Sequence, residues 1–457
     1  MGGIAALAAA SGHRVSGSDS NVYPPMSTQL KRLGIDVIEG YDPRQLDPTP
    51  DCVVIGNALS RGNPAVEAVL ERGLPYSSGP QWLAEQVLQK RHVLAVAGTH
   101  GKTTTASMLS WILEDASLKP GFLIGGIPAN FGSSARFGES GYFVVEADEY
   151  DTAFFDKRAK FVHYRPRTLL LNNLEFDHAD IYKDIDAIVW QFHQLLRTVP
   201  GNGRLIVNAD DANLQLVLDR GCWTPVETFG LQKTADWRAR FLDSGERRLA
   251  IEGPGGGCAE TTWSLAGLHN LENALAAVAV SVSVGVPLDR AVDSLSRFQG
   301  VKRRMERTAT VGDIEIYDDF AHHPTAIRRT LAGLRSRYPG QRLVVALELR
   351  SNTMKLGVHN KTLASSLSEA NLAYIFRPAE LGAGFERELA QLGDRVHLFS
   401  EYEPLVTELV QLAQAGDRLV FMSNGGFGMV RQQVTAALQE KLTSGAEILP
   451  PTRPILD

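Results

Sequence analysis

The chain has 457 residues, of which 44% are hydrophobic and 21% charged, and this length predicts about three domains of roughly 150 residues each. The net charge is −6 and no block of lysine or arginine stands out, so we expect no nucleic-acid partner. Three cysteines, Cys52, Cys222 and Cys258, form no C-x-x-C pair, which favours a reducing compartment, and we expect the cytoplasm.

Residues 1–90 alternate short apolar runs with helical patterns, which is typical of a parallel sheet with crossover helices. We expect strands at 14–17, 36–38 and 53–56 and helices at 26–33 and 65–70. Gly2 and Gly3, followed by an apolar helical stretch, resemble the end of a glycine-rich phosphate loop whose preceding strand is absent. We therefore expect the natural chain to begin roughly a dozen residues earlier. This apolar start has no basic region before it, so we do not interpret it as an export signal.

Asp19 ends the first of these strands, where a dinucleotide-binding fold places an acid beside a ribose, although acids end many strands.

His92 to Thr105 reads H-V-L-A-V-A-G-T-H-G-K-T-T-T and begins the second predicted domain, residues 91–304. An apolar β-branched run stops at Gly98, and Gly101 and Lys102 open a helical pattern, so the stretch predicts strand, loop and helix. Glycines let backbone N–H groups surround phosphate oxygens, and the lysine adds a positive charge. The loop is a shortened variant, because the general pattern G-x-x-x-x-G-K-[ST] would place its first glycine at Val96. It predicts a nucleoside triphosphate site.

Two further apolar runs, residues 142–145 and 168–171, each lead into polar residues. The first ends in E-A-D-E-Y-D, and an acid such as Glu146 at the carboxyl end of a strand beside a phosphate loop can hold Mg²⁺. The second leads into N-N-L-E-F-D-H-A-D. Its His178 is either a metal ligand or a histidine bonded to neighbouring carboxylates, and the pattern does not decide between them.

The longest apolar tract, Ala274 to Val286, is interrupted by serines and shorter than the roughly 20 residues that span a bilayer, so we expect a buried helix and no membrane insertion. Asn270, which precedes it, is of the type that caps helices. Beyond the tract, Gly300 to Arg307 contains four basic side chains at a predicted domain junction, where they could meet phosphate across a cleft.

The alternating pattern resumes over residues 305–457, with strands expected at 314–317, 343–347, 372–376, 396–399 and 419–422. The first of them ends in D-D-F-A-H-H-P-T, in which Pro324 suits an early helical position, and the fifth ends in S-N-G-G. We expect a third α/β domain whose functional loops lie at the carboxyl ends of its strands.

The order along the whole chain of G-T-H-G-K-T-T, E-A-D-E, D-H-x-D, G-x-H-N-x-x-N, an arginine pair and D-D-x-x-H-H-P resembles the Mur ligases, ATP-dependent amide-forming enzymes of peptidoglycan metabolism. The resemblance implies an α/β fold with three domains. These are a Rossmann-like UDP-binding domain (1–90), a central P-loop ATPase domain with a mostly parallel sheet (91–304) and a Rossmann-like peptide-substrate domain (305–457).

Within the family, the stretches Asn21–Thr28, Glu149–Arg158, Asn172–Ile181 and Arg350–Lys355 are most similar to the branch that joins the recycled murein tripeptide, L-alanyl-γ-D-glutamyl-meso-diaminopimelate, to UDP-N-acetylmuramate. The alternative is the branch that adds L-alanine, which typically has serine at the position of Tyr150. Outside enzymes, the alternative is a nucleotide-gated sensor of muropeptides. We expect a monomer or a weak homodimer.

The resemblance also implies roles for single residues. The loop Gly98, Thr99, His100, Gly101, Lys102, Thr103 and Thr104 would bind ATP, with His269, Asn270 and Asn273 at the base. Thr103, Glu146 and His178 would hold metal, and Lys102, Arg304, Asp319 and His322 would be catalytic. The UDP moiety would be bound by Gly2, Gly3, Asp19, Asn57, Ala58 and Ser60. The peptide would be bound by Arg350, Ser351 and Asn352. Arg350 is alternatively a surface arginine paired with a glutamate. Several relatives carry a carbamylated lysine that bridges two metals, whereas Gln191 and Phe192 stand near that point here.

Overall fold

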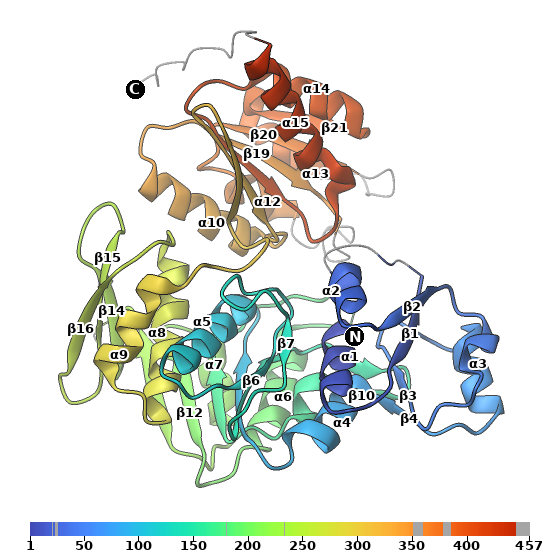
Figure 1. Cartoon of the computed structure of the whole chain (residues 1–457). Helices are drawn as coiled ribbons and strands as arrows, with labels where there is room; N and C mark the ends of the chain where they lie inside the picture. Colours follow the sequence, from blue (N-terminus) through green and yellow to red (C-terminus); the bar gives the residue numbers. More distant parts are fainter. Residues whose placement is uncertain are drawn as a thin grey trace.

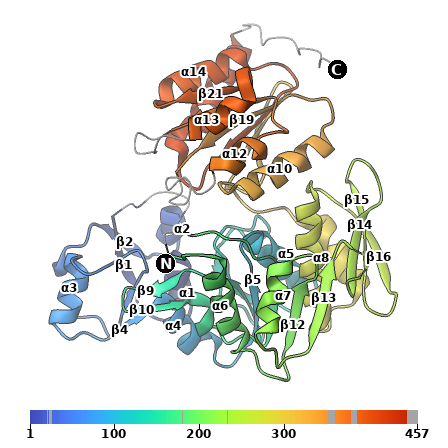
Figure 2. The ribbon, with the colours of Figure 1, turned by 180° about the vertical axis from the view of Figure 1, so that it is seen from behind.

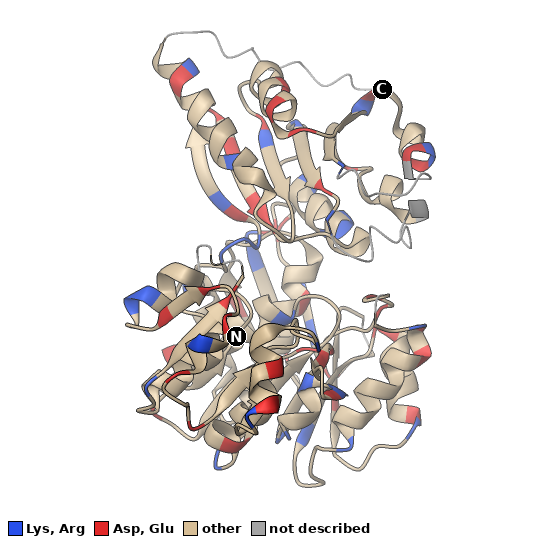
Figure 3. Cartoon of the chain, turned by 90° about the vertical axis from the view of Figure 1, so that its right-hand side faces the viewer, with Lys and Arg blue, Asp and Glu red and all other residues tan. Residues whose placement is uncertain are grey.

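The computed structural model describes residues 1–20, 22, 26–179, 181–232, 234–350, 360–377 and 385–444. The chain forms a lower body of two adjoining parts, residues 1 to about 304, and an upper part that contains the remaining strands (Figure 1). Basic and acidic residues are interspersed along the described elements of the lower body and the upper part (Figure 3), in agreement with the balanced composition.

The N-terminal part contains two pairs of parallel strands, as its alternating pattern predicted. Strand β1 (Ser16–Asp19) pairs with β2 (Asp36–Glu39), and β3 (Val53–Ile55) pairs with β4 (Tyr76–Ser78). The helices are α1 (Gly2–Ala10), α2 (Met26–Arg32), α3 (Pro64–Glu71) and α4 (Gly79–Leu83). Strand β1 begins two residues later than we predicted, since Arg14 and Val15 precede it.

The middle part is built on a ten-stranded sheet with the order β16-β15-β14-β13-β12-β11-β5-β8-β6-β7. Its strands are β5 (His92–Ala97), β6 (Gly121–Leu123), β7 (Ala135–Arg136), β8 (Tyr142–Ala147), β11 (Thr168–Leu171), β12 (Arg204–Asn208), β13 (Val226–Gly230), β14 (Trp237–Phe241), β15 (Arg248–Glu252) and β16 (Cys258–Thr262). From β6 to β14 neighbouring strands run parallel, whereas β7 at one edge and the β14-β15-β16 meander at the other are antiparallel. A small antiparallel pair, β9 (Asp151–Ala153) and β10 (Asp156–Ala159), lies outside this sheet.

Helices cover both faces of this sheet (Figures 1 and 2). On one face are α5 (Lys102–Asp115), α8 (Leu268–Ser283) and α9 (Leu288–Ser294), and on the other α6 (Ile185–Leu196), α7 (Ala212–Asp219), α1 and α4. In β5, Leu94 and Val96 pack into the first layer, and Val93, Ala95 and Ala97 into the second. Because the strand is buried on both faces, its sequence is a continuous apolar run. The tract predicted as a buried helix lies mostly in α8, and none of the described helices is long and apolar enough to cross a bilayer.

The C-terminal part contains a six-stranded sheet with the order β17-β18-β22-β19-β20-β21. The five strands that we predicted are β18 (Ile314–Asp319), β19 (Leu343–Glu348), β20 (Leu372–Phe376), β21 (Val396–Phe399) and β22 (Arg418–Met422), all parallel, and β17 (Glu306–Val311) adds an antiparallel edge. The helices are α10 (Pro324–Arg337), α12 (Asn360–Ser366), α13 (Phe385–Leu389), α14 (Tyr402–Leu412) and α15 (Val430–Thr443). The predicted three-part α/β architecture is thereby confirmed, while the boundaries near residues 90 and 304 stay predictions.

Helix α10 holds the upper body against the lower one. A Cβ atom at Gly333 would lie 2.8 Å from the Cα of Gly267, so the two backbones touch and leave no room for a side chain. The carboxylate of Glu246 accepts hydrogen bonds from the Gly267 N–H and from the Ser336 hydroxyl, both at 2.6 Å. At the other end of the helix, the ring of its N-cap residue His323 lies 4.7 Å from that of His100, centroid to centroid, so the start of α10 lies beside the predicted phosphate loop.

Candidate active site

The predicted strand, loop and helix are β5, residues 98–101 and α5. Gly101 is the N-cap of α5 with a φ of 79°, and Lys102 is the first helical residue. A Cβ atom at position 101 would lie 2.3 Å from Oδ1 of Asn273. Glycine is therefore required at this position by both the positive φ and the close packing. The loop's N–H groups and the helix N-terminus are suited to bind phosphate.

The segment after β11 holds the loop in place. Asn173 accepts a hydrogen bond from the N–H of Thr99 on its carbonyl oxygen (3.0 Å) and one from the N–H of His100 on Oδ1 (2.7 Å). The Thr99 hydroxyl donates to the carbonyl of Glu175 (3.2 Å). The motif N-N-L-E thus supports the phosphate loop, a role that its sequence did not reveal.

Lys102 belongs to a buried cluster of three titratable groups. Its Nζ lies 2.8 Å from Oε2 of Glu149, whose Oε1 lies 3.2 Å from Nε2 of His178. Glu149 is only 1% exposed. Burial alone would raise the pKa of this carboxyl group, but Lys102 and His178 outweigh burial and hold it below its usual value. Lys102 therefore remains positively charged, as phosphate binding requires.

A hydroxyl, a carboxylate and a guanidinium meet beside this cluster. Thr103 Oγ1 donates to Oε1 of Glu146 (2.8 Å) and accepts from Nη2 of Arg304 (3.2 Å). Oε2 of Glu146 accepts the N–H of Gly125 (2.6 Å). Hydroxyl and carboxylate oxygens are the ligands that Mg²⁺ prefers, so the donor set of Thr103 and Glu146 fits the predicted metal.

His178 has the environment of the second predicted alternative, a histidine hydrogen-bonded to neighbouring carboxylates. Its ring Nε2 lies 3.2 Å from Oε1 of Glu149, and its backbone N–H donates to Oδ1 of Asp177 (2.7 Å). The ring of Tyr150 lies 4.1 Å from the imidazole, centroid to centroid. The role of His178 as a metal ligand stays a prediction.

The residues predicted to bind the base of ATP line a pocket between the first turn of α8 and the upper body. They are His269, Asn270 and Asn273, and Arg304 and Asp319 line the same pocket. Oδ1 of Asn273 accepts from the Thr105 hydroxyl (3.0 Å), which fixes α8 against α5. Asn270 is not the N-cap of α8, because the helix already begins at Leu268. Its Nδ2 instead donates to the carbonyl of Ala266 (2.7 Å).

Stability should depend on pH through His269 in this pocket. Burial, with a smaller contribution from Arg329, lowers the pKa of His269 from 6.5 to about 4. A depressed histidine pKa means that the unfolded chain binds the proton more tightly. The free energy of unfolding should therefore fall as the pH is lowered from 6.5 to 4, by at most about 1.4 kcal/mol per pH unit. Urea unfolding of the wild type and His269→Gln across this range measures the effect. Equal pH slopes for the two proteins would contradict it.

The predicted residues of the C-terminal part lie near the ends of β18 and β19. Asp319 is buried, and its carboxylate accepts from the Ala321 N–H and the Thr330 hydroxyl, both at 3.0 Å. Nδ1 of His322 lies 3.0 Å from the carbonyl of Phe320.

Arg350 follows β19 and lies against the loop after β22, because a Cβ at Gly425 would come within 2.4 Å of its Nη1. Ser351 and Asn352 lie outside the described residues.

The predicted UDP-binding residues lie where the N-terminal strands end. Asp19 is the last residue of β1 and accepts from the Tyr41 hydroxyl (3.1 Å), and Asn57, Ala58 and Ser60 follow β3. Gly2 and Gly3 allow close helix packing, since Cβ atoms there would meet the side chains of Met26 and Leu123. The predicted contact of Gly2 and Gly3 with UDP stays a prediction.

Glu175 connects the phosphate loop to α10 and was missed by the sequence analysis. Its Oε2 lies 3.3 Å from Nε2 of His100, 2.7 Å from the Thr325 hydroxyl and 3.9 Å from Nδ1 of His323. The donor atoms of the two histidines and Glu175 all lie within 4.8 Å of one another. Nothing in the sequence motif distinguishes this acid from its neighbours.

Three family models match the chain: "Mur ligase family, catalytic domain" over residues 1–91, "Mur ligase middle domain" over 96–281 and "Mur ligase, glutamate ligase domain" over 303–425. The chain belongs to the Mur ligase family, and the resemblance inferred from its motifs is confirmed.

Among individual relatives, the UDP-N-acetylmuramate–L-alanyl-γ-D-glutamyl-meso-2,6-diaminoheptandioate ligase of Escherichia coli K12 is 51% identical over 444 residues, 96% of each chain. The UDP-N-acetylmuramate–L-alanine ligase of Psychrobacter sp. PRwf-1 is 32% identical over 95% of this chain and 92% of its own. The crystal structure of a murein peptide ligase from Psychrobacter arcticus 273-4 superposes with a TM-score of 0.76 at 44% identity, covering 96% of both chains.

Proposed function

We propose that the chain is an ATP-dependent ligase that joins L-alanyl-γ-D-glutamyl-meso-diaminopimelate to UDP-N-acetylmuramate in murein recycling. The observation that carries this proposal is the 51% identity, over almost the whole length of both chains, to the E. coli ligase named for this reaction. Identity to the relative named for L-alanine addition is 32%. Tyr150 against His178, at the position where the alanine-adding branch typically has serine, favours the same choice.

Formation of an amide in water requires an activated carboxylate. In the proposed course, the lactyl carboxylate of UDP-N-acetylmuramate attacks the γ-phosphate of ATP and displaces ADP. The alanyl amine then attacks the resulting acyl phosphate, inorganic phosphate leaves, and the amide remains. Because the attacking group is the substrate carboxylate itself, no nucleophilic side chain is needed. Lys102 and Arg304 stabilise the negative charge on the transferred phosphoryl group. Mg²⁺ held by Thr103 and Glu146 would supply further charge neutralisation when bound.

The attacking amine must lose a proton, and His322 is better suited than Asp319 to accept it. Both Asp319 oxygens already accept hydrogen bonds, whereas burial lowers the pKa of His322, so that its ring is neutral at pH 7. Relay of the proton through water is the alternative. We expect this reaction in the cytoplasm, by a monomer or a weak homodimer.

Mass spectrometry of the products from ATP, Mg²⁺, UDP-N-acetylmuramate and an equimolar mixture of the tripeptide and L-alanine tests the proposal. The tripeptide conjugate should dominate. A dominant alanine conjugate would move the chain to the alternative branch. A lack of any conjugate, without phosphate release, would favour the non-catalytic sensor of muropeptides.

A further inference from the structure

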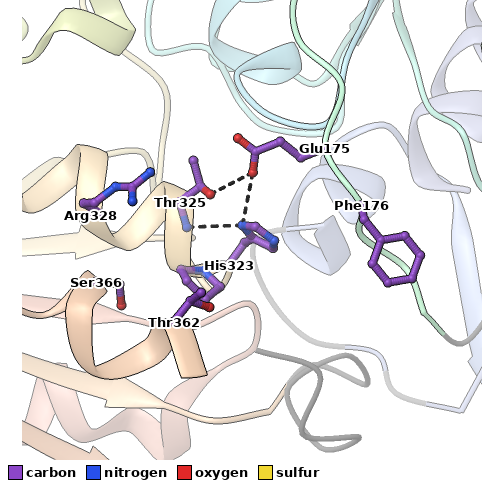
Figure 4. A pocket seen from close by; sticks show the side chains of 8 residues that line it. Glu175, Phe176, His323, Thr325, Arg328, Thr362 and Ser366 are labelled. Atoms are coloured by element: carbon purple, nitrogen blue, oxygen red, sulfur yellow. Dashed lines mark hydrogen bonds and ion pairs between the residues drawn. The ribbon is translucent and has the colours of Figure 1, made fainter. Parts of the chain in front are cut away.

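A second pocket, of about 290 Å³, lies where the segment after β11 faces helices α10 and α12 (Figure 4). Its lining includes Glu175, Phe176, His323, Arg328, Thr362 and Ser366. It is separate from the base pocket, which Arg329 lines from the same helix. None of the roles proposed above uses it.

The pocket is lined by one acidic side chain, Glu175, and one basic side chain, Arg328. Every described contact of the Glu175 carboxylate uses Oε2, and the side chain is one-third exposed, so Oε1 can accept a ligand. The guanidinium of Arg328 forms no hydrogen bond or ion pair with any other residue in the described parts of the chain. Figure 4 shows the Arg328 and Glu175 side chains on either side of Thr325. The pocket thus offers an anion and a cation to one ligand.

Such a pair is complementary to a zwitterion. ATP and UDP-N-acetylmuramate carry only negative charges, whereas the far end of diaminopimelate carries an ammonium and a carboxylate on the same carbon. We propose that this pocket receives that end of the tripeptide, with Arg328 on the carboxylate and Glu175 Oε1 on the ammonium. The assignment rests on the proposed function, because it specifies how that peptide is recognised.

The position of the pocket agrees with the length of the peptide. Glu175 precedes His178 by three residues, and His323 adjoins His322, so the pocket lies on the order of 10 Å from these proposed site residues. The tripeptide, with its γ-linkage and long third side chain, spans on the order of 15 Å when extended. Its alanyl amine can therefore reach the acyl phosphate while its other end occupies the pocket.

Steady-state kinetics of Arg328→Ala with two peptides tests the assignment. One is the diaminopimelate tripeptide, and the other is its L-lysine analogue, which keeps the distal ammonium but lacks the distal carboxylate. For the first peptide, KM should rise by about tenfold or more with kcat nearly unchanged, because a charge-assisted pair is lost. For the analogue, KM should change less than twofold. Arg328→Lys should recover part of the loss, since lysine keeps the charge without the planar fork.

Arg220→Ala, which removes an arginine at the end of α7, serves as the control and should match the wild type with both peptides. An unchanged KM for the diaminopimelate peptide in Arg328→Ala, or an equal loss with both peptides, would overturn the pocket assignment and leave the proposed function intact. Failure of the wild type to join either peptide would instead overturn the proposed function.

Discussion

Replacement of Lys102 by methionine is expected to lower kcat by about 1,000-fold or more, because the variant loses the positive charge that stabilises the phosphoryl group in the transition state. Lys102 is the first residue of α5, beside Gly98 and Thr99, whose carbonyls lie 2.6 and 3.4 Å from its Nζ. Phosphate release coupled to conjugate formation measures the effect. Lys157→Met is the matched control, since that lysine is exposed and pairs only with Asp151 among the described residues. A Lys102→Met variant within tenfold of the wild type would contradict the proposed role.

The same substitution should also destabilise the protein, because it leaves Glu149 buried without its main cation. Removal of one partner of a buried pair typically costs about 3–5 kcal/mol. Adding Glu149→Gln to Lys102→Met removes the unpaired charge and should restore much of the lost stability, as measured by urea unfolding, without restoring turnover. If turnover returned together with stability, the loss in the single variant would have been a folding defect.

The phosphate loop could be predicted from sequence because its signals are local. An apolar run buried on both faces, Gly98 and Gly101 and the following helical pattern occupy consecutive positions, and each has a conformational cause in the structure. The same holds for the parallel strands of the C-terminal part, which are short apolar runs followed by turns. In both cases the loop that follows the strand holds the candidate functional residues.

The antiparallel edge of the middle sheet was missed for a different reason. In β14 buried residues alternate with half-buried or exposed ones, and no residue of β16 is fully buried. Both strands contain charged side chains, so their sequences resemble polar loops more than buried strands. Glu149 and Glu175 were missed because they stand among other acids. Only the folded chain places Glu149 between Lys102 and His178, and Glu175 between His100 and Thr325. A pairing between residues far apart in the sequence leaves no local pattern.

The second large effect is expected for Arg304→Ala, whose kcat should fall by about 1,000-fold while the affinity for ATP changes little. Arg304 lies at the junction of the two bodies, and its guanidinium covers the ring of Phe320 at 4.7 Å and reaches Thr103 Oγ1. It is therefore held at the phosphoryl group from the C-terminal side. Single-turnover phosphate release, with fluorescent-nucleotide binding measured in parallel, separates the loss of chemistry from a loss of binding.

The neighbouring Arg303→Ala is the informative comparison, because it removes the same charge at the adjacent position. Arg303 donates to the carbonyls of Ser423 and Gly425 at 2.8 and 2.6 Å, so it holds the loop after β22. Its loss should therefore raise the KM for the peptide more than it lowers kcat. Arg304→Lys should recover only a small part of the lost kcat although it keeps the charge, since an ammonium cannot replace the planar guanidinium over the Phe320 ring. A kcat loss in Arg303→Ala as large as in Arg304→Ala would show that junction geometry, rather than charge at the phosphoryl group, limits the reaction.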